Sequence, residues 1–327
     1  MSTLKVGVLS MGDMGAGIAR FLRSKDIQVA TNCQGRSEDT IERTKKADVE
    51  MLPSDLELVQ QCQVILSIVP PKDAVATAQR VADALSGGSA KDNVVFIDMN
   101  AVAPSTCRDI GILFEKARVP VTFVDGCIIG GPPKRKNDTE ATKSEIDSFS
   151  SDSEWEIPNL PLSGPEFLSK LPDGDKLGKF LGLKIFSEDV GAASGLKMCF
   201  ASMAKGFTAI ATQSFATAQN MGVLDELKIQ LKEVMPINLS MAERRVPGMP
   251  PKAYRWVKEM EEIGKTMEEE GGWDAPIFKG AAGVYKAVAD DMVLGKEKIG
   301  KRSRGTTLDD VAVCLAEGLQ RKKKKTD

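Results

Sequence analysis

The sequence has 327 residues, of which 42% are hydrophobic and 28% charged, and its formal net charge is −2. This length predicts two domains, and the composition is typical of a globular protein. The small net charge argues against nucleic-acid or membrane-surface partners, and no run approaches the roughly 18 apolar residues of a membrane span.

Histidine is absent, and six cysteines are scattered without CxxC spacing. Thiols placed mainly in apolar runs are expected to be buried and reduced. The first residues, MSTLKVGVLS, lack the regions of a signal peptide, so we expect a cytoplasmic protein. Without histidine we expect no metal site, and a general acid or base must be a lysine, tyrosine, cysteine or carboxyl group.

Strands and helices alternate from residue 4 to residue 189. Helices are predicted at about 14–23, 37–47, 73–85 and 105–117. Strands are predicted at 4–9, 27–31, 63–69, 94–99 and 121–126, with strand-like pieces at 159–164 and 183–188. This alternation predicts an α/β domain over residues 1–189, built on a doubly wound parallel sheet.

Two segments differ from this pattern. Residues 134–157 are polar, charged and rich in serine, which predicts a mobile and disordered surface loop. After residue 189 the chain is predicted to be all helical, with a long apolar helix at 192–221 that should be buried on all sides and an amphipathic helix at 252–267. Residues 320–327 form a basic tail, expected to be a solvated terminus; a nuclear signal or an anion contact is the alternative.

A glycine-rich turn follows the first strand. Residues 10–17 (SMGDMGAG) resemble the G-x-G-x-x-G fingerprint, with Ser10 in place of its first glycine. Gly12 would let the backbone approach a pyrophosphate, and Gly15 would let the helix pack closely on the strand. A purely structural turn is the alternative. The turn predicts a Rossmann-type dinucleotide site with these cofactor-binding residues: Ser10, Met11, Gly12, Asp13, Met14 and Gly15.

The end of the second strand indicates which dinucleotide binds. No carboxylate stands at the tip of this strand to bond the ribose hydroxyls of NAD; Asn32, Arg36 and Ser37 offer hydrogen-bond donors instead. The residues therefore favour NADP over NAD, the alternative being a plain turn that caps the next helix. Val69 and Pro70 follow the strand at 63–69 and are predicted to cover the nicotinamide, unless they only end the strand.

Three later motifs complete a family resemblance. They are residues 98–104 (DMNAVAP), 125–131 (DGCIIGG) and 191–197 (GAASGLK). Together with the turn, they resemble the D-x-S-T-x-x-P, D-A-P-V-S-G-G and G-x-G-x-x-x-K segments of the β-hydroxyacid dehydrogenase superfamily, which includes 6-phosphogluconate and 3-hydroxyisobutyrate dehydrogenases. Residues 196–206 and 250–263 are similar to the C-terminal domain of poorly characterised proteins grouped with the phosphogluconate dehydrogenases.

The resemblance implies a function and an organisation. It implies use of NADP or NAD, oxidation of a 3-hydroxy acid, and an all-helical domain at 190–319 that binds substrate and forms a homodimer. Three polar substrate contacts of the family are changed, because Asn100-Ala101, Ile129 and Ala201 stand where the family has Ser or Thr, Ser, and Asn. The substrate is therefore expected to differ from the one those groups recognise.

Lys197 is the predicted general acid/base, since the resemblance places it at the catalytic lysine and its neighbours are apolar. A surface lysine is the alternative. Lys205 lies two helical turns further on the same face and is predicted to bind a substrate carboxylate or phosphate; a solvated lysine is equally compatible. Asn100 is predicted to contact cofactor and substrate, or to be a simple turn residue, and Gly130 and Gly131 are predicted to contact substrate.

The leading hypothesis is an NADP-dependent dehydrogenase or reductase of a small anionic substrate, a 3-hydroxy or oxo acid with or without a phosphate. An imine reductase-like enzyme is a second hypothesis within the same architecture. A non-catalytic NADP(H)-binding regulator or scaffold is the third, because three substrate contacts are changed. Neither nucleic acid nor a membrane is expected as a partner.

Overall fold

The computed structural model describes residues 4–87, 93–136, 152 and 154–326. The chain forms two compact units, Met1–Lys197 and Met198–Asp327. The predicted domain boundary at residue 189 lies ahead of a long helix, α7 (Ala192–Met221), whereas the division between the units falls inside that helix. The helix therefore begins in the N-terminal unit and continues through the C-terminal unit.

The N-terminal unit contains an eight-stranded sheet in the order β10-β9-β6-β5-β4-β1-β2-β3. Strands β1 to β6 pair with one another in parallel. Strand β9 pairs antiparallel with β6, and β10 pairs parallel with β9. The predicted doubly wound, mostly parallel sheet is therefore confirmed. The strands of this sheet are β1 (Lys5–Leu9), β2 (Gln28–Asn32), β3 (Glu50–Leu52), β4 (Val64–Ser67), β5 (Val94–Asp98), β6 (Val121–Gly126), β9 (Pro161–Ser163) and β10 (Lys184–Ser187).

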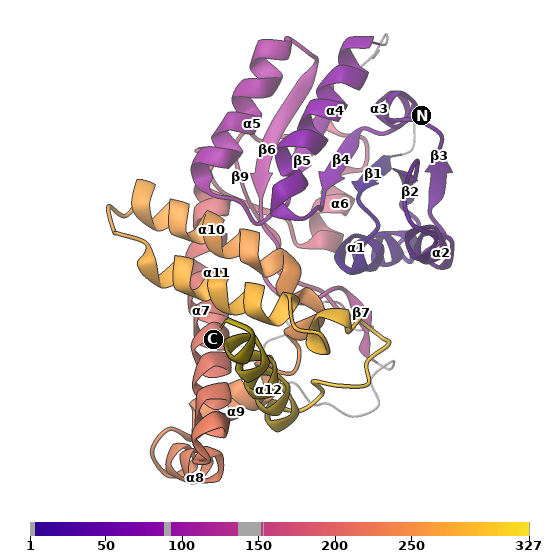
Figure 1. Ribbon diagram of the computed structural model, residues 1–327. Coiled ribbons are helices and arrows are strands. Elements are labelled where there is room, and N and C mark those ends of the chain that lie inside the picture. The colour runs from indigo at the N-terminus through magenta and orange to yellow at the C-terminus, as the bar shows by residue number, and fades with distance from the viewer. Residues whose placement is uncertain (1–3, 88–92, 137–151, 153, 327) are drawn as a thin grey trace. The chain divides into compact units, whose positions relative to one another are not determined.

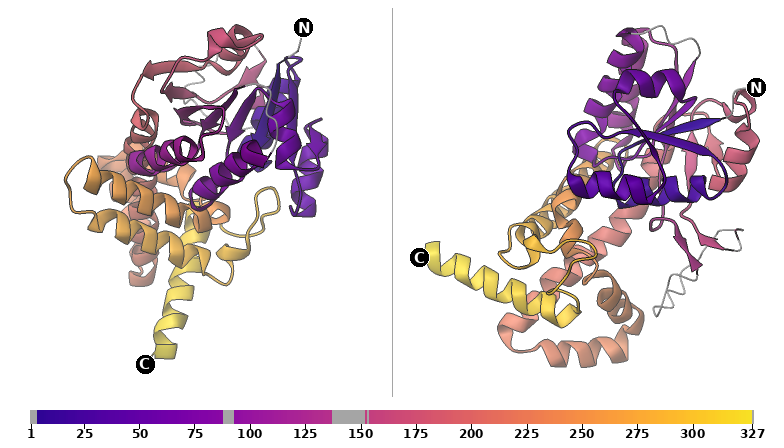
Figure 2. Two further views of the ribbon diagram at one scale, coloured as in Figure 1. Left: turned by 90° about the horizontal axis from the view of Figure 1, so that it is seen from above. Right: turned by 90° about the vertical axis from the view of Figure 1, so that its right-hand side faces the viewer.

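Helices cover both faces of this sheet (Figures 1 and 2). The central strands are apolar on both sides, as parallel strands between two helical layers must be. Alternate residues therefore enter different cores: Val64 and Leu66 pack with α1 and α6, whereas Ile65 packs with α3, α4 and α5. The helices are α1 (Asp13–Arg23), α2 (Glu38–Lys46), α3 (Asp55–Gln61), α4 (Ala74–Gly87), α5 (Pro104–Ala117) and α6 (Gly174–Leu181), with short 3-10 helices at Pro71–Asp73 and Leu168–Lys170.

Three of these elements, β3, α3 and α6, were not predicted from the sequence. All three are short, so their apolar pattern covers too few residues to stand out. A local signal for α3 exists: the Ser54 hydroxyl accepts a hydrogen bond from the Glu57 N–H at 3.1 Å, as a residue at a helix start does.

The ends of the segment 134–157 are ordered, which corrects the prediction of one continuous loop. β7 (Lys134–Arg135) pairs antiparallel with β8 (Trp155–Glu156). The Trp155 ring is buried edge-on against Phe21 of α1, with ring centroids 5.5 Å apart. Asp152 forms an ion pair with Lys25 at 2.6 Å. The predicted loop at 137–151 and 153 lies outside the described residues.

The C-terminal unit is helical, as predicted. It consists of the continuation of α7, then α8 (Leu224–Val234), α9 (Pro236–Arg245), α10 (Ala253–Glu269), α11 (Pro276–Ala289) and α12 (Leu308–Thr326), with short 3-10 helices at Pro250–Lys252 and Leu294–Lys296. Helices α10 and α11 pack together, and the Trp256 and Tyr285 rings meet edge to face with centroids 5.2 Å apart. The basic tail is not a separate extended segment, because α12 continues to Thr326.

The expectation that α7 is buried on all sides is wrong. Met203 and Ile210 on this helix are 78% and 61% exposed. The same helix buries small residues such as Ala201 and Ala209, so its apolar surface is divided into a packed side and an uncovered side. The apolar sequence therefore marks two surfaces, of which the chain itself covers one.

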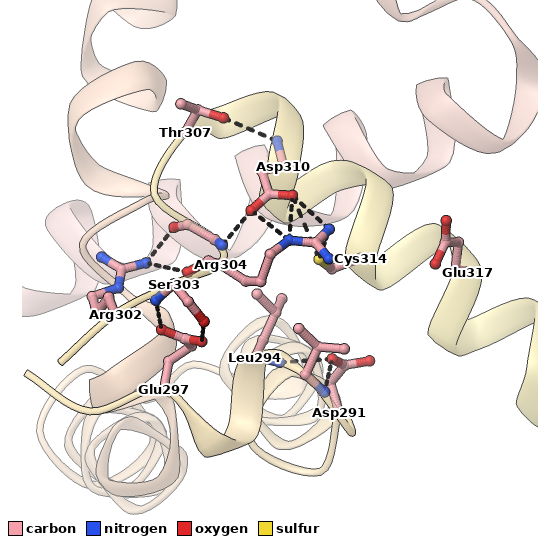
Figure 3. Close-up of polar contacts among 12 residues, drawn as sticks. Asp291, Leu294, Glu297, Arg302, Ser303, Arg304, Thr307, Asp310, Cys314 and Glu317 are labelled. Atoms are coloured by element: carbon pink, nitrogen blue, oxygen red, sulfur yellow. Dashed lines mark hydrogen bonds and ion pairs between the residues drawn. The ribbon is translucent and has the colours of Figure 1, made fainter.

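The loop before α12 is held by a polar cluster (Figure 3). Arg304 donates to Asp310 with Nη2–Oδ1 at 2.7 Å and also reaches the Cys314 sulfur at 3.1 Å. Asp310 accepts the backbone N–H of Gly305 as well. These contacts lie at the first turns of α12, where a carboxylate is favoured by the helix dipole, and they fix the loop that precedes the helix.

Candidate functional site

The nucleotide turn joins β1 to α1 at the carboxyl edge of the sheet (Figure 1). A Cβ atom on Gly15 would lie 2.0 Å from the carbonyl oxygen of Ser10, so only glycine allows the helix to approach the turn this closely. Met11 is buried, and Ser10 donates its N–H to the Ile68 carbonyl at 3.2 Å. The turn is thus fixed between β1 and the segment that follows β4.

Gly12 leaves open space where a ligand fits. A Cβ atom there would meet nothing within 4 Å, and no side chain caps this start of α1. The first amides of a helix lack partners within the helix, and the helix dipole favours negative charge beside them. Asp13 begins the helix, and Met14 is half-buried against the core. The turn therefore fits a pyrophosphate group.

The residues at the end of β2 have different roles. Asn32 is buried, and its side chain accepts the Gln34 N–H at 2.8 Å, so it shapes the chain after the strand. Arg36 is exposed and has no ion pair within the described residues. Ser37 is exposed at the start of α2, with its hydroxyl 3.1 Å from that of Thr40. Arg36 is therefore the residue of this group best placed to take an external anion.

A carboxylate that the sequence analysis missed lies beside Asn32. Asp55, at the start of α3, accepts from the Asn32 amide at 2.8 Å. Two of the three guanidinium nitrogens of Arg80 donate to the same carboxylate, Nε at 2.8 Å and Nη2 at 2.9 Å. Both of its oxygens are thus engaged by protein donors. Nothing in the linear sequence links Asp55 to the end of β2, because this residue belongs to a separate helix, α3.

The ends of β4 and β5 are tied together by Asn100. Its side-chain oxygen accepts the Val69 N–H at 2.7 Å, and its amide nitrogen donates to the Ser67 hydroxyl at 2.9 Å. Asn100 is 3% exposed. This geometry favours the turn-forming alternative for Asn100, since both side-chain groups already have protein partners. Val69 and Pro70 are half-buried at the same edge, next to the nucleotide turn.

Two buried carboxylates lie side by side at the ends of β5 and β6. Asp98 pairs with Asp125 in the strand register. Burial raises the pKa of Asp98 to about 7, against the lowering effect of the hydrogen bond from the Asn100 N–H; the neighbouring Asp125 raises it further. The second oxygen of Asp98 has no hydrogen-bond partner within the described residues. Burying an oxygen without a partner costs less free energy for a protonated carboxyl group than for an ionised one.

Asp125 anchors the start of α7. One of its oxygens accepts the backbone N–H groups of Gly191 at 2.9 Å and Ser194 at 3.0 Å, and also the Ser163 hydroxyl at 2.9 Å. The other accepts the Ser194 hydroxyl at 2.7 Å. A carboxylate at a helix N-terminus satisfies unpaired amides and complements the helix dipole. Asp125 thereby fixes the direction in which α7 leaves the sheet.

Lys197 lies in the second turn of this anchored helix. Its ammonium donates to the Ile128 carbonyl, in the loop after β6. The lysine is half-buried, whereas the adjacent Leu196 and Phe200 are exposed. It is therefore less enclosed by apolar neighbours than its sequence suggested, but it is tied to the substrate-loop motif at residues 125–131.

That loop is fixed by its backbone. Ile129 exchanges two hydrogen bonds with Asn159, each 2.9 Å long. Gly130 has a φ angle of +132°, a conformation that favours glycine, and a Cβ atom there would lie 3.1 Å from Pro158. Gly131 is exposed. The two glycines follow β6, at the same edge of the sheet as the nucleotide turn.

Lys205 belongs to the C-terminal unit. Its ammonium forms an ion pair with Glu259 of α10 and lies 5.2 Å from the centroid of the Trp256 ring. The Glu259 side chain is 9% exposed. The structure therefore gives Lys205 a partner within its own unit. The other candidate residues meet around the carboxyl edge of the sheet.

The described residues contain no helix long and apolar enough to cross a membrane. Comparison with known families matches residues 5–141 to the NAD binding domain of 6-phosphogluconate dehydrogenase. Residues 218–288 match a domain of unknown function, DUF1932.

Individual proteins are also similar to this chain. An uncharacterized 28.5 kDa protein from the 7S RNA 5′ region of Methanothermus fervidus is 26% identical over 230 residues, which are 70% of this chain and 77% of that protein. Two solved structures share the fold. The 3-hydroxyisobutyrate dehydrogenase of Mycobacterium tuberculosis has a TM-score of 0.61 at 16% identity, covering 96% of this chain and 99% of that one. A reductive aminase from Aspergillus terreus, in complex with NADPH and ethyl levulinate, has a TM-score of 0.51 at 14% identity, covering 96% and 99%.

These matches confirm the resemblance drawn from the four motifs. Residues 5–141 and 218–288 thus match, in this order, an NAD-binding domain of the 6-phosphogluconate dehydrogenase type and a DUF1932 domain.

Proposed function

We propose that this protein is an NADP-dependent dehydrogenase or reductase that acts on a small 3-hydroxy or oxo acid, with or without a phosphate. The observation that carries this proposal is the position of Lys197. Asp125 anchors the first turn of α7, and the lysine in the next turn binds the loop after β6. That loop and the nucleotide turn lie at the same edge of the sheet, so an ammonium group is available where a cofactor and a substrate would meet.

Lys197 is proposed to move the proton of the reaction. A bound nicotinamide supplies the hydride acceptor or donor. When an alcohol is oxidised, Lys197 acts as the neutral amine and takes the hydroxyl proton, becoming an ammonium group; in reduction the ammonium form returns a proton to the developing alkoxide. The Ile128 carbonyl holds the amine in place beside Gly130 and Gly131, whose backbone is proposed to contact the substrate.

NADP is preferred to NAD in this proposal because of the residues near the end of β2. Arg36 is an exposed guanidinium, a group suited to a 2′-phosphate. Asp55 is the carboxylate closest to Asn32 among the contacts of that strand end, and its oxygens already bind Arg80 and Asn32. A carboxylate engaged in this way is a poor partner for ribose hydroxyls.

Replacing Lys197 by methionine tests the catalytic assignment. We expect turnover to fall by about 10²–10⁴-fold, the usual contribution of a positioned acid or base, while the Kd for NADPH changes less than about twofold. The assay follows NADPH absorbance in both directions across a panel of hydroxy and oxo acids. Leu196→Met, on the adjacent exposed position, is the matched control. Unchanged turnover in Lys197→Met rules out the proposed role.

An imine substrate is the second candidate. The likeness to a reductive aminase favours it, because that enzyme shares the fold over most of both chains. Cyclic imines in the same assay decide between the two: faster turnover of imines than of any oxo acid would replace the leading proposal. NADPH binding without turnover of either class would instead support the regulator or scaffold.

We also propose a cytoplasmic homodimer. Apolar side chains are exposed on three consecutive helices of the C-terminal unit, an unusual surface for a lone chain. The six free cysteines are compatible with a reducing compartment. The exposed large apolar residues of α7, α8 and α9 within the C-terminal unit are Phe200, Met203, Ile210, Met221, Ile229, Val234 and Ile237.

A further inference from the structure

A basic cavity lies beside the nucleotide turn but on the flank of α1. Its volume is about 420 Å³. Its lining residues lie along α1 from Asp13 to Arg20, on α2 (Arg43 and Lys46) and at positions 132–134. The substrate and nicotinamide candidates follow the ends of β4, β5 and β6, and none of them lines this cavity; of the predicted cofactor-binding residues, only Asp13 does.

Four cations and one carboxylate line the cavity. Lys46 has an ion pair with Glu42 at 2.7 Å, and Lys134 has one with Glu156 at 3.0 Å. Arg20 and Arg43 have no carboxylate partner within the part of the chain that the structure describes. Like charges gathered in one cavity repel each other, and a multivalent anion between them removes this repulsion.

Arg43 is held in place for such an anion. Its Nε donates to the Met11 carbonyl at 3.2 Å, and its Nη2 donates to the Thr40 hydroxyl at 3.2 Å. These bonds fix the plane of the guanidinium, which has five N–H groups in all. A side chain that is already ordered loses little entropy when it binds a ligand.

We propose that this cavity binds a small multivalent phosphate, such as a pyrophosphate or a doubly phosphorylated metabolite, at a site separate from the dinucleotide crevice. Guanidinium groups bind phosphate oxygens in pairs, and two lysines supply further charge from the other walls. The volume suits a small ligand, and the four cationic side chains of the lining favour an anionic one. The anion is linked to the nucleotide turn through the bond from Arg43 to Met11.

Calorimetric titration with inorganic pyrophosphate at constant ionic strength tests this proposal. The full chain is titrated alone and after saturation with NADPH, and citrate is titrated as a carboxylate of similar charge. We expect one site whose Kd changes less than about twofold when NADPH is present. Arg20→Gln and Lys46→Ala should each weaken pyrophosphate binding about tenfold, the effect of losing one charge-assisted contact.

Lys45→Ala is the matched control, because Lys45 is an exposed lysine of α2 that does not line the cavity. Its Kd should stay within about twofold of the parent protein. Absence of binding, an equal loss in all three variants, or displacement of pyrophosphate by NADPH would overturn the separate site. Citrate binding as tightly as pyrophosphate would overturn its phosphate class. Thermal melts without ligand establish that each variant is folded.

Discussion

Two glycines of one turn offer a matched pair of substitutions with opposite expected effects. Gly15→Ala places a Cβ atom 2.0 Å from the Ser10 carbonyl oxygen, whereas Gly12→Ala places one in open space. The backbone at Gly12 has φ −71° and ψ −174°, which alanine adopts without strain. The first change should therefore damage the folded domain, and the second should damage only ligand binding.

The magnitudes follow from the geometry. For Gly15→Ala the helix or the turn must move by about 1 Å to restore an allowed contact, since real Cβ atoms essentially never lie within 3.0 Å of such a neighbour. Overpacking of this kind costs about 1–3 kcal/mol, which lowers Tm by about 2–12 °C in a unit of this size. For Gly12→Ala two effects on stability oppose each other. Alanine lowers the entropy of the unfolded chain, which stabilises the fold, but it is less favourable than glycine at the start of α1. The net change in the free energy of unfolding should stay within about 1 kcal/mol.

Thermal melts and NADPH titrations of both variants provide the assay. We expect Gly12→Ala to weaken NADPH binding at least about tenfold, because its methyl group occupies the place where backbone and pyrophosphate would meet. Its Tm should remain within about 2 °C of the parent protein. The reasoning is refuted if Gly12→Ala melts as early as Gly15→Ala, or if it binds NADPH with unchanged affinity.

Two further predictions concern buried charge and exposed apolar surface. Because the pKa of Asp98 is raised from 3.8 to about 7, the folded state keeps a proton that the unfolded state has lost, so stability falls by up to about 4 kcal/mol as pH rises from about 4 to about 7. Urea unfolding at several pH values should show this slope in the parent protein and not in Asp98→Asn; parallel pH curves would contradict it. Ile210→Glu, at a position 61% exposed, should leave Tm within about 2 °C and shift sedimentation from dimer to monomer, whereas a dimer that persists would contradict the proposed interface.

The elements that were predicted correctly are those whose runs of apolar residues indicate burial directly. β4 and β5 are runs of apolar residues because helices cover both faces of the sheet. Short elements carry less information: β3 has three residues, two of them exposed, and α6 has eight. Trp155 is a different case, because its segment is polar overall and predicts a loop. Its ring nevertheless packs on Phe21, and this contact holds the ordered end of the segment.

The sequence predicts those parts of the candidate site in which a motif determines the backbone conformation. It does not predict the contacts between side chains that come from different helices and strands. Gly15 was assigned correctly as a close-packing glycine, because the fingerprint itself encodes that contact. The partners of Asn100 are Ser67 and the Val69 backbone, on a different strand end. The sequence offered no means of telling whether this amide would face a ligand or its neighbours, and Asp55 escaped notice for the same reason.

The buried carboxylate of Asp125 explains how catalytic placement and substrate choice can be separate properties of this chain. Its four hydrogen bonds join β6, β9 and the start of α7, and they set the position of Lys197 without contacting any solvent-facing group. Asn100 and Ile129, two of the positions that depart from the family motifs, take no part in this network. Under the proposed function, changes at these positions therefore alter the substrate that binds beside Lys197 while leaving the lysine in place. The proposed proton transfer by Lys197 is thus compatible with a substrate that differs from those of related proteins.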